Sequence, residues 1–204
     1  MTCGPTWVRV DPVRVISNIS SGELGHAVVH GLRKEKAKVT LLQGPVTHPL
    51  STTGARVVAF RYFDELSRLL KHELKKRSYA IVIHAAAVAD YALKNSFRGK
   101  ISSRTKNLRL CLTPTPKLIA QIKKIDPNIF LVGFKLETDL TEKRLIQKAR
   151  GLIREAKCDL VVANTLCAKA YRACIIDAQG RVLAKARTRA KTAACLIKVL
   201  KGRL

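Results

Sequence analysis

The feature that most constrains the fold is an alternation between short apolar runs and amphipathic helical patterns along most of the chain. Residues 79–84 form a nearly continuous apolar run, which is typical of a parallel strand buried on both faces. Over residues 22–36 and 63–77, apolar residues instead recur every three or four positions, as they do on one face of a helix. Strands that alternate with helices in this way predict an α/β chain with a doubly wound, Rossmann-like, mostly parallel sheet.

The same alternation continues toward the end of the chain. Further strands are expected at residues 38–42, 56–60, 129–134 and 159–163, and further helices at residues 118–125, 145–153 and 190–200. Residues 174–183 predict a hairpin, because Asp177-Ala178-Gln179-Gly180 separates two apolar runs. Between His84 and Leu118 the alternation fails, and residues 97–112 predict a β-arm that projects from the sheet. No repeat or linker interrupts the pattern, so we expect residues 1–204 to form a single domain.

The charge of the chain points to anionic partners. Its 39 Lys and Arg residues against 14 Asp and Glu residues give a formal net charge of +25. Such a field attracts nucleic acids, acidic membranes or small phosphorylated substrates. The basic residues are spread over the whole chain, however, and aromatic residues make up only 5%, which is few for base stacking. Non-specific binding of nucleic acid therefore stays open as an alternative.

The remaining composition is that of an ordinary globular chain, with 47% hydrophobic residues. No apolar run approaches the roughly 18 residues of a membrane span, and residues 1–5 lack the pattern of a secretion signal, so we expect no membrane partner and a cytoplasmic location. The six cysteines form no CxxC pair, which favours reduced and mostly buried thiols over a metal site. His26 and His30 have helical spacing, but no carboxylate lies between them as in a zinc motif.

Three segments lie where ligands bind in doubly wound sheets, at the carboxyl ends of strands. Residues 17–25 combine hydroxyls and glycines before a helix, which predicts a phosphate cradle or a plain helix cap. Residues 84–91 follow the buried strand with small side chains and one acid, Asp90, which predicts either a nucleotide contact or a close-packed turn. Lys100 lies on the arm, where a lysine is either solvated or placed to bind an anion.

Eight segments occur along the chain in a fixed order. They are GPT (4–6), DPVRVISNISSGELG (11–25), TLLQGPV (40–46), AAVADY (86–91), KISS (100–103), TPKLI (115–119), VGFKLETD (132–139) and DLVVAN (159–164). Taken together, they resemble the phosphopantothenoylcysteine synthetase family. The forms KISS and GFKLET are more similar to the stand-alone synthetases than to the bacterial two-domain proteins, in which KIKK and GFAAET are usual.

The resemblance implies a ligase that joins 4′-phosphopantothenate to cysteine in coenzyme A biosynthesis. In this chemistry CTP or ATP activates the carboxylate as an acyl-nucleotidylate, and pyrophosphate is released. The cysteine amine then displaces CMP or AMP and forms the amide. Mg²⁺ is expected to accompany the triphosphate.

The resemblance also assigns roles to residues of this chain. Asn18 is expected to hydrogen-bond the acyl-nucleotidylate, and Lys100 to neutralise charge on the reacting phosphate. The residues expected to bind the nucleotide together with Lys100 are Ser20, Ser21, Gly22, Ala86, Asp90, Lys117 and Phe134. A homodimer is expected, in which the arm of residues 97–112 reaches the site of the partner.

Two departures from the family pattern bear on these expectations. The first strand, which would be central in the sheet, has only Met1-Thr2-Cys3 available, so either a short strand suffices or the natural start lies upstream. Ser102 and Ser103 replace the later lysines of KIKK. A non-catalytic relative that still binds nucleotide therefore also stays open as an alternative.

Overall fold

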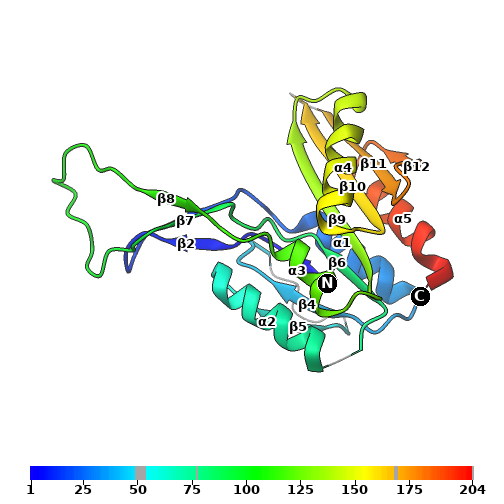
Figure 1. The fold of residues 1–204 in the computed structure, drawn as a ribbon, viewed down its shortest axis with the longest axis horizontal. Coiled ribbons are helices and arrows are strands. Elements are labelled where there is room, and N and C mark those ends of the chain that lie inside the picture. Colours follow the sequence, from blue (N-terminus) through cyan, green and yellow to red (C-terminus); the bar gives the residue numbers. More distant parts are fainter. Residues whose placement is uncertain (49–53, 77, 168–169, 204) are drawn as a thin grey trace.

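The structure, a computed structural model, describes residues 1–48, 54–76, 78–167 and 170–203. Its centre is an eight-stranded sheet (Figure 1). From one edge to the other, the strands are β12 (Val182–Ala186), β11 (Ala170–Asp177), β10 (Leu160–Cys167), β9 (Phe130–Thr138), β6 (Ile81–His84), β1 (Thr2–Cys3), β4 (Thr40–Gln43) and β5 (Arg56–Ala59). The strands from β10 to β5 are parallel, and β11 and β12 extend the sheet in antiparallel fashion. The predicted α/β, mostly parallel sheet is confirmed.

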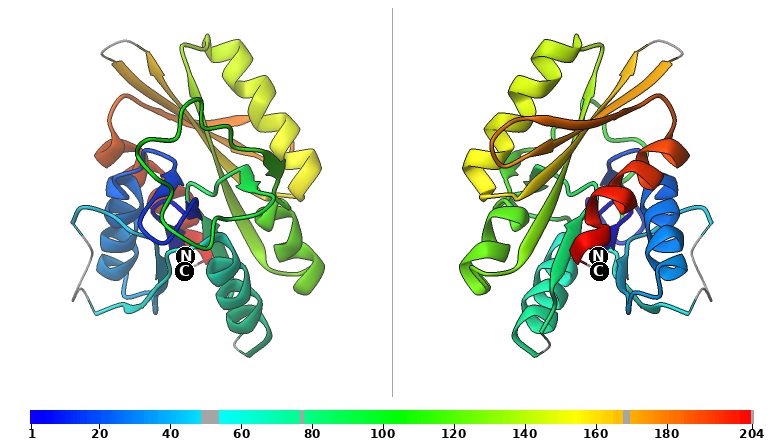
Figure 2. Two further views of the ribbon diagram at one scale, coloured as in Figure 1. Left: turned by 90° about the vertical axis from the view of Figure 1, so that its left-hand side faces the viewer. Right: turned by 90° about the vertical axis from the view of Figure 1, so that its right-hand side faces the viewer.

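Helices cover both faces of this sheet (Figure 2). One face packs against α1 (Glu23–Lys34) and α5 (Arg189–Leu200), which is followed by the short 3₁₀ helix η1 (Lys201–Arg203). The other face packs against α2 (Phe63–Lys76), α3 (Leu118–Ile125) and α4 (Glu142–Ala156). Successive side chains of β9 therefore point to opposite faces of the sheet. Leu131 belongs to the core beneath α3 and α4, and Val132 belongs to the core beneath α1 and α5. This two-faced burial explains the continuous apolar runs of the central strands.

The helices match their predicted periodicity, with small shifts at their ends. Helix α4 begins three residues before the predicted residue 145, because Thr141 accepts a hydrogen bond from the backbone N–H of Arg144 and caps the helix there. Strands β9 and β10 run beyond residues 134 and 163, since they pair with each other as far as Thr138 and Leu166. No helix within the described ranges is long and apolar enough to cross a membrane.

The first strand consists of two residues and is nevertheless central. Thr2 pairs with Leu42 of β4 and with His84 of β6, and Cys3 pairs with Gln43. The backbone continues to bond beyond the strand, because the carbonyl of Cys3 accepts from the N–H of Gly44 and that of Gly4 accepts from Ala87. The two residues of β1 therefore pair with the strands on both sides of it in the middle of the sheet.

The arm differs in detail from its prediction. Its paired strands are β7 (Tyr91–Leu93) and β8 (Leu112–Pro114), which lie at its base, and residues 94–111 form neither helix nor strand. The strand pairing expected within residues 97–112 was therefore wrong except at Leu112. A hairpin of β2 (Trp7–Arg9) and β3 (Val15–Ser17), which was not predicted, contacts the base of the arm through β2 and β7 and projects with it (Figure 1).

Candidate active site

Two adjoining clefts open at the carboxyl ends of β6 and β9, the edge at which open α/β sheets bind ligands. The serine cleft, beside residues 18–25, has a volume of about 490 Å³. The lysine cleft, between residues 115–119 and residues 144–155, has a volume of about 780 Å³. Both are lined by the same central residues, namely Ala86, Val88, Asp90, Phe134 and Lys135. A ligand, or two ligands that react together, can therefore bind across both clefts.

The turn before α1 forms the outer wall of the serine cleft and includes Ser20, Ser21 and Gly22. Ser21 Oγ accepts a hydrogen bond from the backbone N–H of Glu23 at 3.3 Å. Gly22 has a φ of +75°, and a Cβ at this position would lie 2.8 Å from Val46 Cγ1. The turn brings the amino terminus of α1 to the cleft wall, where its partial positive charge favours anions.

Gly25 and Cys3 form the base of this wall. A Cβ at Gly25 would lie 2.5 Å from Cys3 Cβ, so glycine allows α1 to pack directly on β1. Burial raises the pKa of the Cys3 thiol to about 12. This thiol is therefore protonated at neutral pH and does not act as a thiolate nucleophile in the cleft.

Asn18, which lines the serine cleft, is hydrogen-bonded to the loop after β6. Its Nδ2 donates hydrogen bonds to the backbone carbonyls of Ala87 at 3.2 Å and Val88 at 3.1 Å. Both amide protons are thereby used, which leaves Oδ1 as the remaining hydrogen-bonding atom of this side chain. Asn18 thus lines the serine cleft, where its amide group orients the backbone of Ala87 and Val88.

A buried polar contact supports the loop that both clefts share. Thr2 Oγ1 lies 3.0 Å from His84 Nδ1, with which it forms a hydrogen bond, and it accepts a second from the backbone N–H of Ala86 at 3.2 Å. Burial lowers the pKa of His84 to about 4, so the imidazole is neutral at neutral pH. The contact fixes Ala86, whose small side chain leaves room for a ligand against the backbone.

Asp90 and Lys117 meet between the two clefts. Lys117 Nζ lies 2.6 Å from Asp90 Oδ1, and both side chains are more than half exposed. Asp90 follows β6, whereas Lys117 precedes the first residue of α3. The structure therefore brings together two predicted site residues that lie 27 positions apart in the sequence.

The lysine cleft is strongly cationic. Its lining includes Lys117, Lys135, Arg144, Lys148 and Arg154, against the two carboxylates of Asp90 and Glu155. Lys135 forms an ion pair with Glu137 at 3.2 Å. A cleft with this balance of charge suits a ligand that carries phosphate groups.

Lys100 is placed differently from the other predicted site residues. It lies exposed on the arm and, among the residues that the structure describes, it does not line either cleft. The arm projects away from the sheet on the side of β2 and β7 (Figure 1). The clefts and Lys100 of one chain are therefore separated.

Several residues that line the clefts were not predicted. Asn164 and Arg189 line the serine cleft, where Arg189 pairs with Glu23 at 3.4 Å. Arg144 and Lys148 line the lysine cleft from α4. Lys135 and Asn164 lie within the recognised segments VGFKLETD and DLVVAN, which were the available signals, whereas Arg144, Lys148 and Arg189 depend on how distant helices meet the sheet edge.

The donor set of the clefts does not resemble a protein metal cage. Within the described ranges, no group of three or more His, Cys, Asp or Glu side chains could hold a metal ion. His26 Nε2 is instead hydrogen-bonded to Gln43 Oε1 at 2.9 Å. Magnesium in nucleotide sites is held mainly by phosphate oxygens and water with one or two carboxylates, which is compatible with Asp90 as the acid between the clefts. The cysteines whose side chains are described are free, as predicted.

Comparisons with known proteins agree with this architecture. Residues 1–201 match the family model described as DNA/pantothenate metabolism flavoprotein C-terminal domain. The chain is 41% identical over 166 residues to the coenzyme A biosynthesis bifunctional protein CoaBC of Thermococcus kodakarensis, covering 81% of this chain and 40% of that protein. It is 32% identical over 164 residues to the CoaBC protein of Methanocaldococcus jannaschii, covering 80% and 39%. The chain thus spans about 40% of the length of these curated relatives.

A solved structure shows the same fold. The crystal structure of the DNA/pantothenate metabolism flavoprotein from Streptococcus pneumoniae superposes with a TM-score of 0.86 at 27% identity, covering 98% of this chain and 96% of that one. The family model covers almost the whole sequence, and the resemblance found in the motifs is confirmed. This chain therefore belongs to the family of the DNA/pantothenate metabolism flavoprotein C-terminal domain.

Proposed function

We propose that this chain is a ligase that joins 4′-phosphopantothenate to cysteine in coenzyme A biosynthesis. The observation that carries the proposal is the pair of clefts that share Ala86, Val88, Asp90, Phe134 and Lys135. A helix amino terminus flanks one cleft and a group of cations flanks the other, so two phosphorylated substrates can meet between them. The names of the CoaBC relatives, which refer to coenzyme A biosynthesis, support the same proposal.

The proposed reaction has two steps. A carboxylate oxygen of 4′-phosphopantothenate attacks the α-phosphorus of CTP or ATP, and the bond to the leaving pyrophosphate breaks. The cysteine amine then attacks the acyl carbonyl, loses a proton, and displaces CMP or AMP as the amide forms. Cationic groups and backbone N–H groups stabilise the charge that develops on phosphate and carbonyl oxygens.

The residues of the clefts divide between these tasks. Ser20, Ser21 and Gly22 hold phosphate oxygens at the start of α1, and Ala86, Asp90, Lys117 and Phe134 bind the remainder of the nucleotide. Because both N–H groups of Asn18 already donate to backbone carbonyls, a hydrogen bond from Asn18 to the acyl-nucleotidylate requires that one of them be exchanged. Mg²⁺ would neutralise phosphate charge when bound, and Asp90, which lines both clefts, is the candidate acid to hold it.

Lys100 enters the proposal through a second copy of the chain. The arm and the β2–β3 hairpin expose apolar side chains, among them Val13, Tyr91, Phe97, Leu108 and Leu112. Exposed apolar side chains gathered on a projecting element are typical of an interface between proteins. We therefore propose a homodimer in which the arm of one chain brings Lys100 to the clefts of its partner.

The test is pyrophosphate release by the purified protein with 4′-phosphopantothenate and either CTP or ATP, with and without cysteine. We expect release with one or both nucleotides, and an amide product only when cysteine is present, as detected by mass spectrometry. Lys100→Gln is expected to slow product formation, whereas Lys71→Gln, which removes the same charge from an exposed position in α2, is the matched control. Pyrophosphate release that stays at background with every nucleotide contradicts the proposal and favours a non-catalytic relative.

A further inference from the structure

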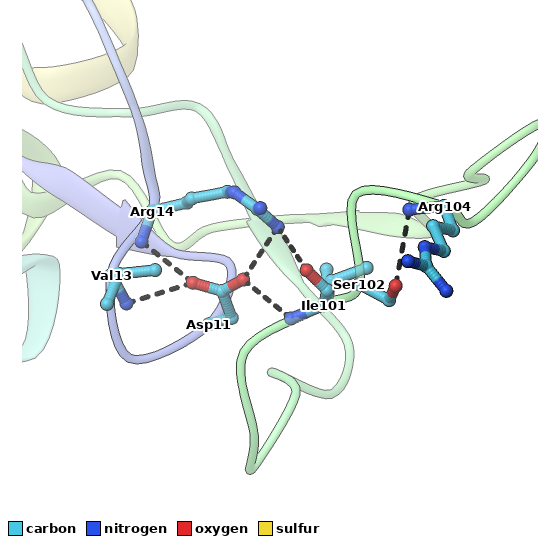
Figure 3. Close-up of polar contacts among 6 residues, drawn as sticks. All are labelled: Asp11, Val13, Arg14, Ile101, Ser102 and Arg104. Atoms are coloured by element: carbon cyan, nitrogen blue, oxygen red, sulfur yellow. Dashed lines mark hydrogen bonds and ion pairs between the residues drawn. The ribbon is translucent and has the colours of Figure 1, made fainter.

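A buried carboxylate holds the arm at the residue that follows Lys100. Asp11 lies in the turn between β2 and β3 and is only 1% exposed. Its Oδ1 accepts hydrogen bonds from the backbone N–H groups of Val13 at 2.9 Å and Arg14 at 2.8 Å. Its Oδ2 accepts from the backbone N–H of Ile101 at 3.1 Å and from Arg14 Nη1 at 3.0 Å (Figure 3). This carboxylate therefore joins the hairpin to the arm.

Ile101 is held through both of its backbone polar groups. Its N–H donates to Asp11, and its carbonyl accepts a hydrogen bond from Arg14 Nη1 at 3.1 Å (Figure 3). The backbone N–H of Phe97 donates to the carbonyl of Val10 at 2.9 Å, which is a second attachment to the same turn. Lys100 lies between these two attachments, in a part of the arm that has neither helix nor strand.

The charge of Asp11 is maintained at neutral pH. Burial alone raises the pKa of a carboxyl group, but hydrogen bonds from the backbone of Val13, Ile101 and Arg14, together with the charge of Arg14, hold the pKa of Asp11 below its usual value. The contacts to the arm are therefore charge-assisted, which makes them stronger than neutral hydrogen bonds.

The chain also turns directly after Ile101. Ser102 Oγ accepts a hydrogen bond from the backbone N–H of Arg104 at 3.2 Å (Figure 3). The carbonyl of Ser102 also accepts one from the backbone N–H of Thr105. Ser102, at a position where the family pattern has lysine, thus stabilises the turn that follows the attached residue.

We propose that Asp11 is a positioning residue that fixes Lys100 for the reaction by holding the backbone of Ile101. The inference rests on the proposed function, because it requires Lys100 to act on a reacting phosphate. Asp11 itself contacts no substrate. The carboxylate restricts the backbone beside Lys100 before substrates bind, so that less ordering is required when the reaction occurs.

Asp11→Asn is the variant that tests this inference most directly. An asparagine of equal size keeps one acceptor oxygen for Val13 and Arg14, but it turns an NH₂ group toward the N–H of Ile101 and Arg14 Nη1. A donor then faces donors in the link between the hairpin and the arm, and the negative charge that strengthens this link is lost. Glu35→Gln is the matched control, because Glu35 at the end of α1 forms an ion pair with Lys201 after α5 and lines neither the clefts nor the arm.

Three measurements are made on the full-length protein. Amide hydrogen exchange of residues 97–104 is expected to rise in Asp11→Asn and to stay unchanged in Glu35→Gln. The kcat of product formation is expected to fall by about tenfold or more in Asp11→Asn with little change in the KM of the nucleotide. The double variant Asp11→Asn/Lys100→Gln is expected to be no slower than Lys100→Gln alone, because Asp11 acts only through Lys100.

The outcomes separate the inference from the proposed function. Unchanged exchange in residues 97–104, an unchanged kcat, or losses that multiply in the double variant would each overturn the positioning role while the wild-type ligase remains active. If the wild-type protein releases no pyrophosphate, the proposed function is contradicted, and the inference with it. If Lys100→Gln is fully active, the role of Lys100 is contradicted, and the positioning role of Asp11 with it. Where Asp11→Asn does not fold, Arg14→Gln removes the donor to the Ile101 carbonyl and is expected to give the same non-additive loss.

Discussion

Buried polar side chains determine where the backbone of the shared loop lies beneath the clefts. Thr2 and His84 lie on neighbouring strands, and Thr2 contacts both the imidazole and the backbone N–H of Ala86. In the sequence these residues are unremarkable members of apolar segments. Their contact depends on the parallel pairing of β1 with β6, which local pattern does not specify, and so it could not be predicted from either segment alone.

The neutral state of His84 predicts a dependence of stability on pH. Its pKa in the folded protein is about 4, below the ordinary value of 6.5, so the unfolded chain binds a proton first as the pH falls. The free energy of unfolding should therefore be highest above pH 6.5 and decline between pH 6.5 and pH 4, by at most about 3 kcal/mol from this group. Urea unfolding at several pH values measures this decline in the free energy of unfolding.

The control for this prediction compares two histidines. In His84→Gln the decline between pH 6.5 and pH 4 should become shallower, because the replacement does not titrate. In His72→Gln, which changes an exposed side chain of α2, the wild-type decline should remain. Equal curves for wild type and His84→Gln would show that another group causes the dependence.

Substitution by alanine at two glycines within helices should change the free energy of unfolding in opposite directions. At Gly25 in α1 a Cβ would lie 2.5 Å from Cys3 Cβ, whereas at Gly151 in α4 no heavy atom lies within 4 Å of it. Gly25→Ala is expected to lower the free energy of unfolding by about 1–3 kcal/mol, because it separates α1 from β1. Gly151→Ala is expected to raise it by about 0.5–1 kcal/mol through helix propensity. Urea unfolding measures this free energy for both variants. A lower free energy of unfolding for Gly151→Ala would contradict the open space at this position.

Most residues expected in the site from contiguous motifs line the clefts, although their roles stay predictions. The sequence pattern shows which residues precede a helix or follow a strand. Ser20, Ser21 and Gly22 precede α1, and Asp90 follows β6. Arg189 could not be predicted in this way, because it reaches the serine cleft only when α5 packs beside α1.

At the scale of elements, periodicity predicted the helices and the longer strands. Each helix buries one apolar stripe along its length, and each central strand is buried on both faces, so both leave a clear pattern in the sequence. The β2–β3 hairpin was missed since its strands contain three residues each, too few to establish an alternation. The interior of the arm was misjudged for another reason. Residues 108–112 have the residue types of a strand, but among residues 94–111 the structure places no strand to pair with them.

A mixing experiment tests whether the arm acts in the site of a partner chain. Asn18 lies in the serine cleft and Lys100 on the arm, so Asn18→Asp and Lys100→Gln are expected to inactivate different parts of one composite site. When the two inactive variants are mixed and allowed to exchange subunits, half of the dimers are hybrids, each with one intact site. About a quarter of the wild-type activity should therefore return at random exchange.

The mixing experiment needs one control and has one contrary outcome. Mixing equal amounts of Lys100→Gln and wild-type protein should give half of the wild-type activity with or without subunit exchange, which shows that a defective subunit does not inhibit the intact site of its partner. If the two defective variants never recover activity together although native mass spectrometry, with an affinity tag on one variant, shows hybrid dimers, Lys100 and Asn18 act within one chain.

At the scale of the whole molecule, the sheet order places the clefts. Strands β6 and β9 are central and parallel, and their carboxyl ends meet the loops that carry the predicted residues. The doubly wound arrangement was predicted from alternation alone, whereas the central position of the short first strand was expected only from the resemblance to the family. The extent of the strands was not, because β9 and β10 are lengthened by pairing with each other rather than by their own apolar pattern.

The net charge of +25 leads to a last prediction, which separates a small-molecule enzyme from a nucleic-acid-binding protein. A general positive field raises the rate at which phosphorylated substrates arrive, so kcat/KM for 4′-phosphopantothenate should fall as salt is raised while kcat changes little. The same field should bind RNA or DNA without specificity, with a dissociation constant no tighter than about 10⁻⁶ M at physiological salt. Filter binding over a salt series measures this affinity beside the kinetics. Nanomolar affinity that persists at physiological salt, with a steep log–log slope, would show instead that many lysines and arginines contact a nucleic acid backbone at once, which two clefts of this size do not require.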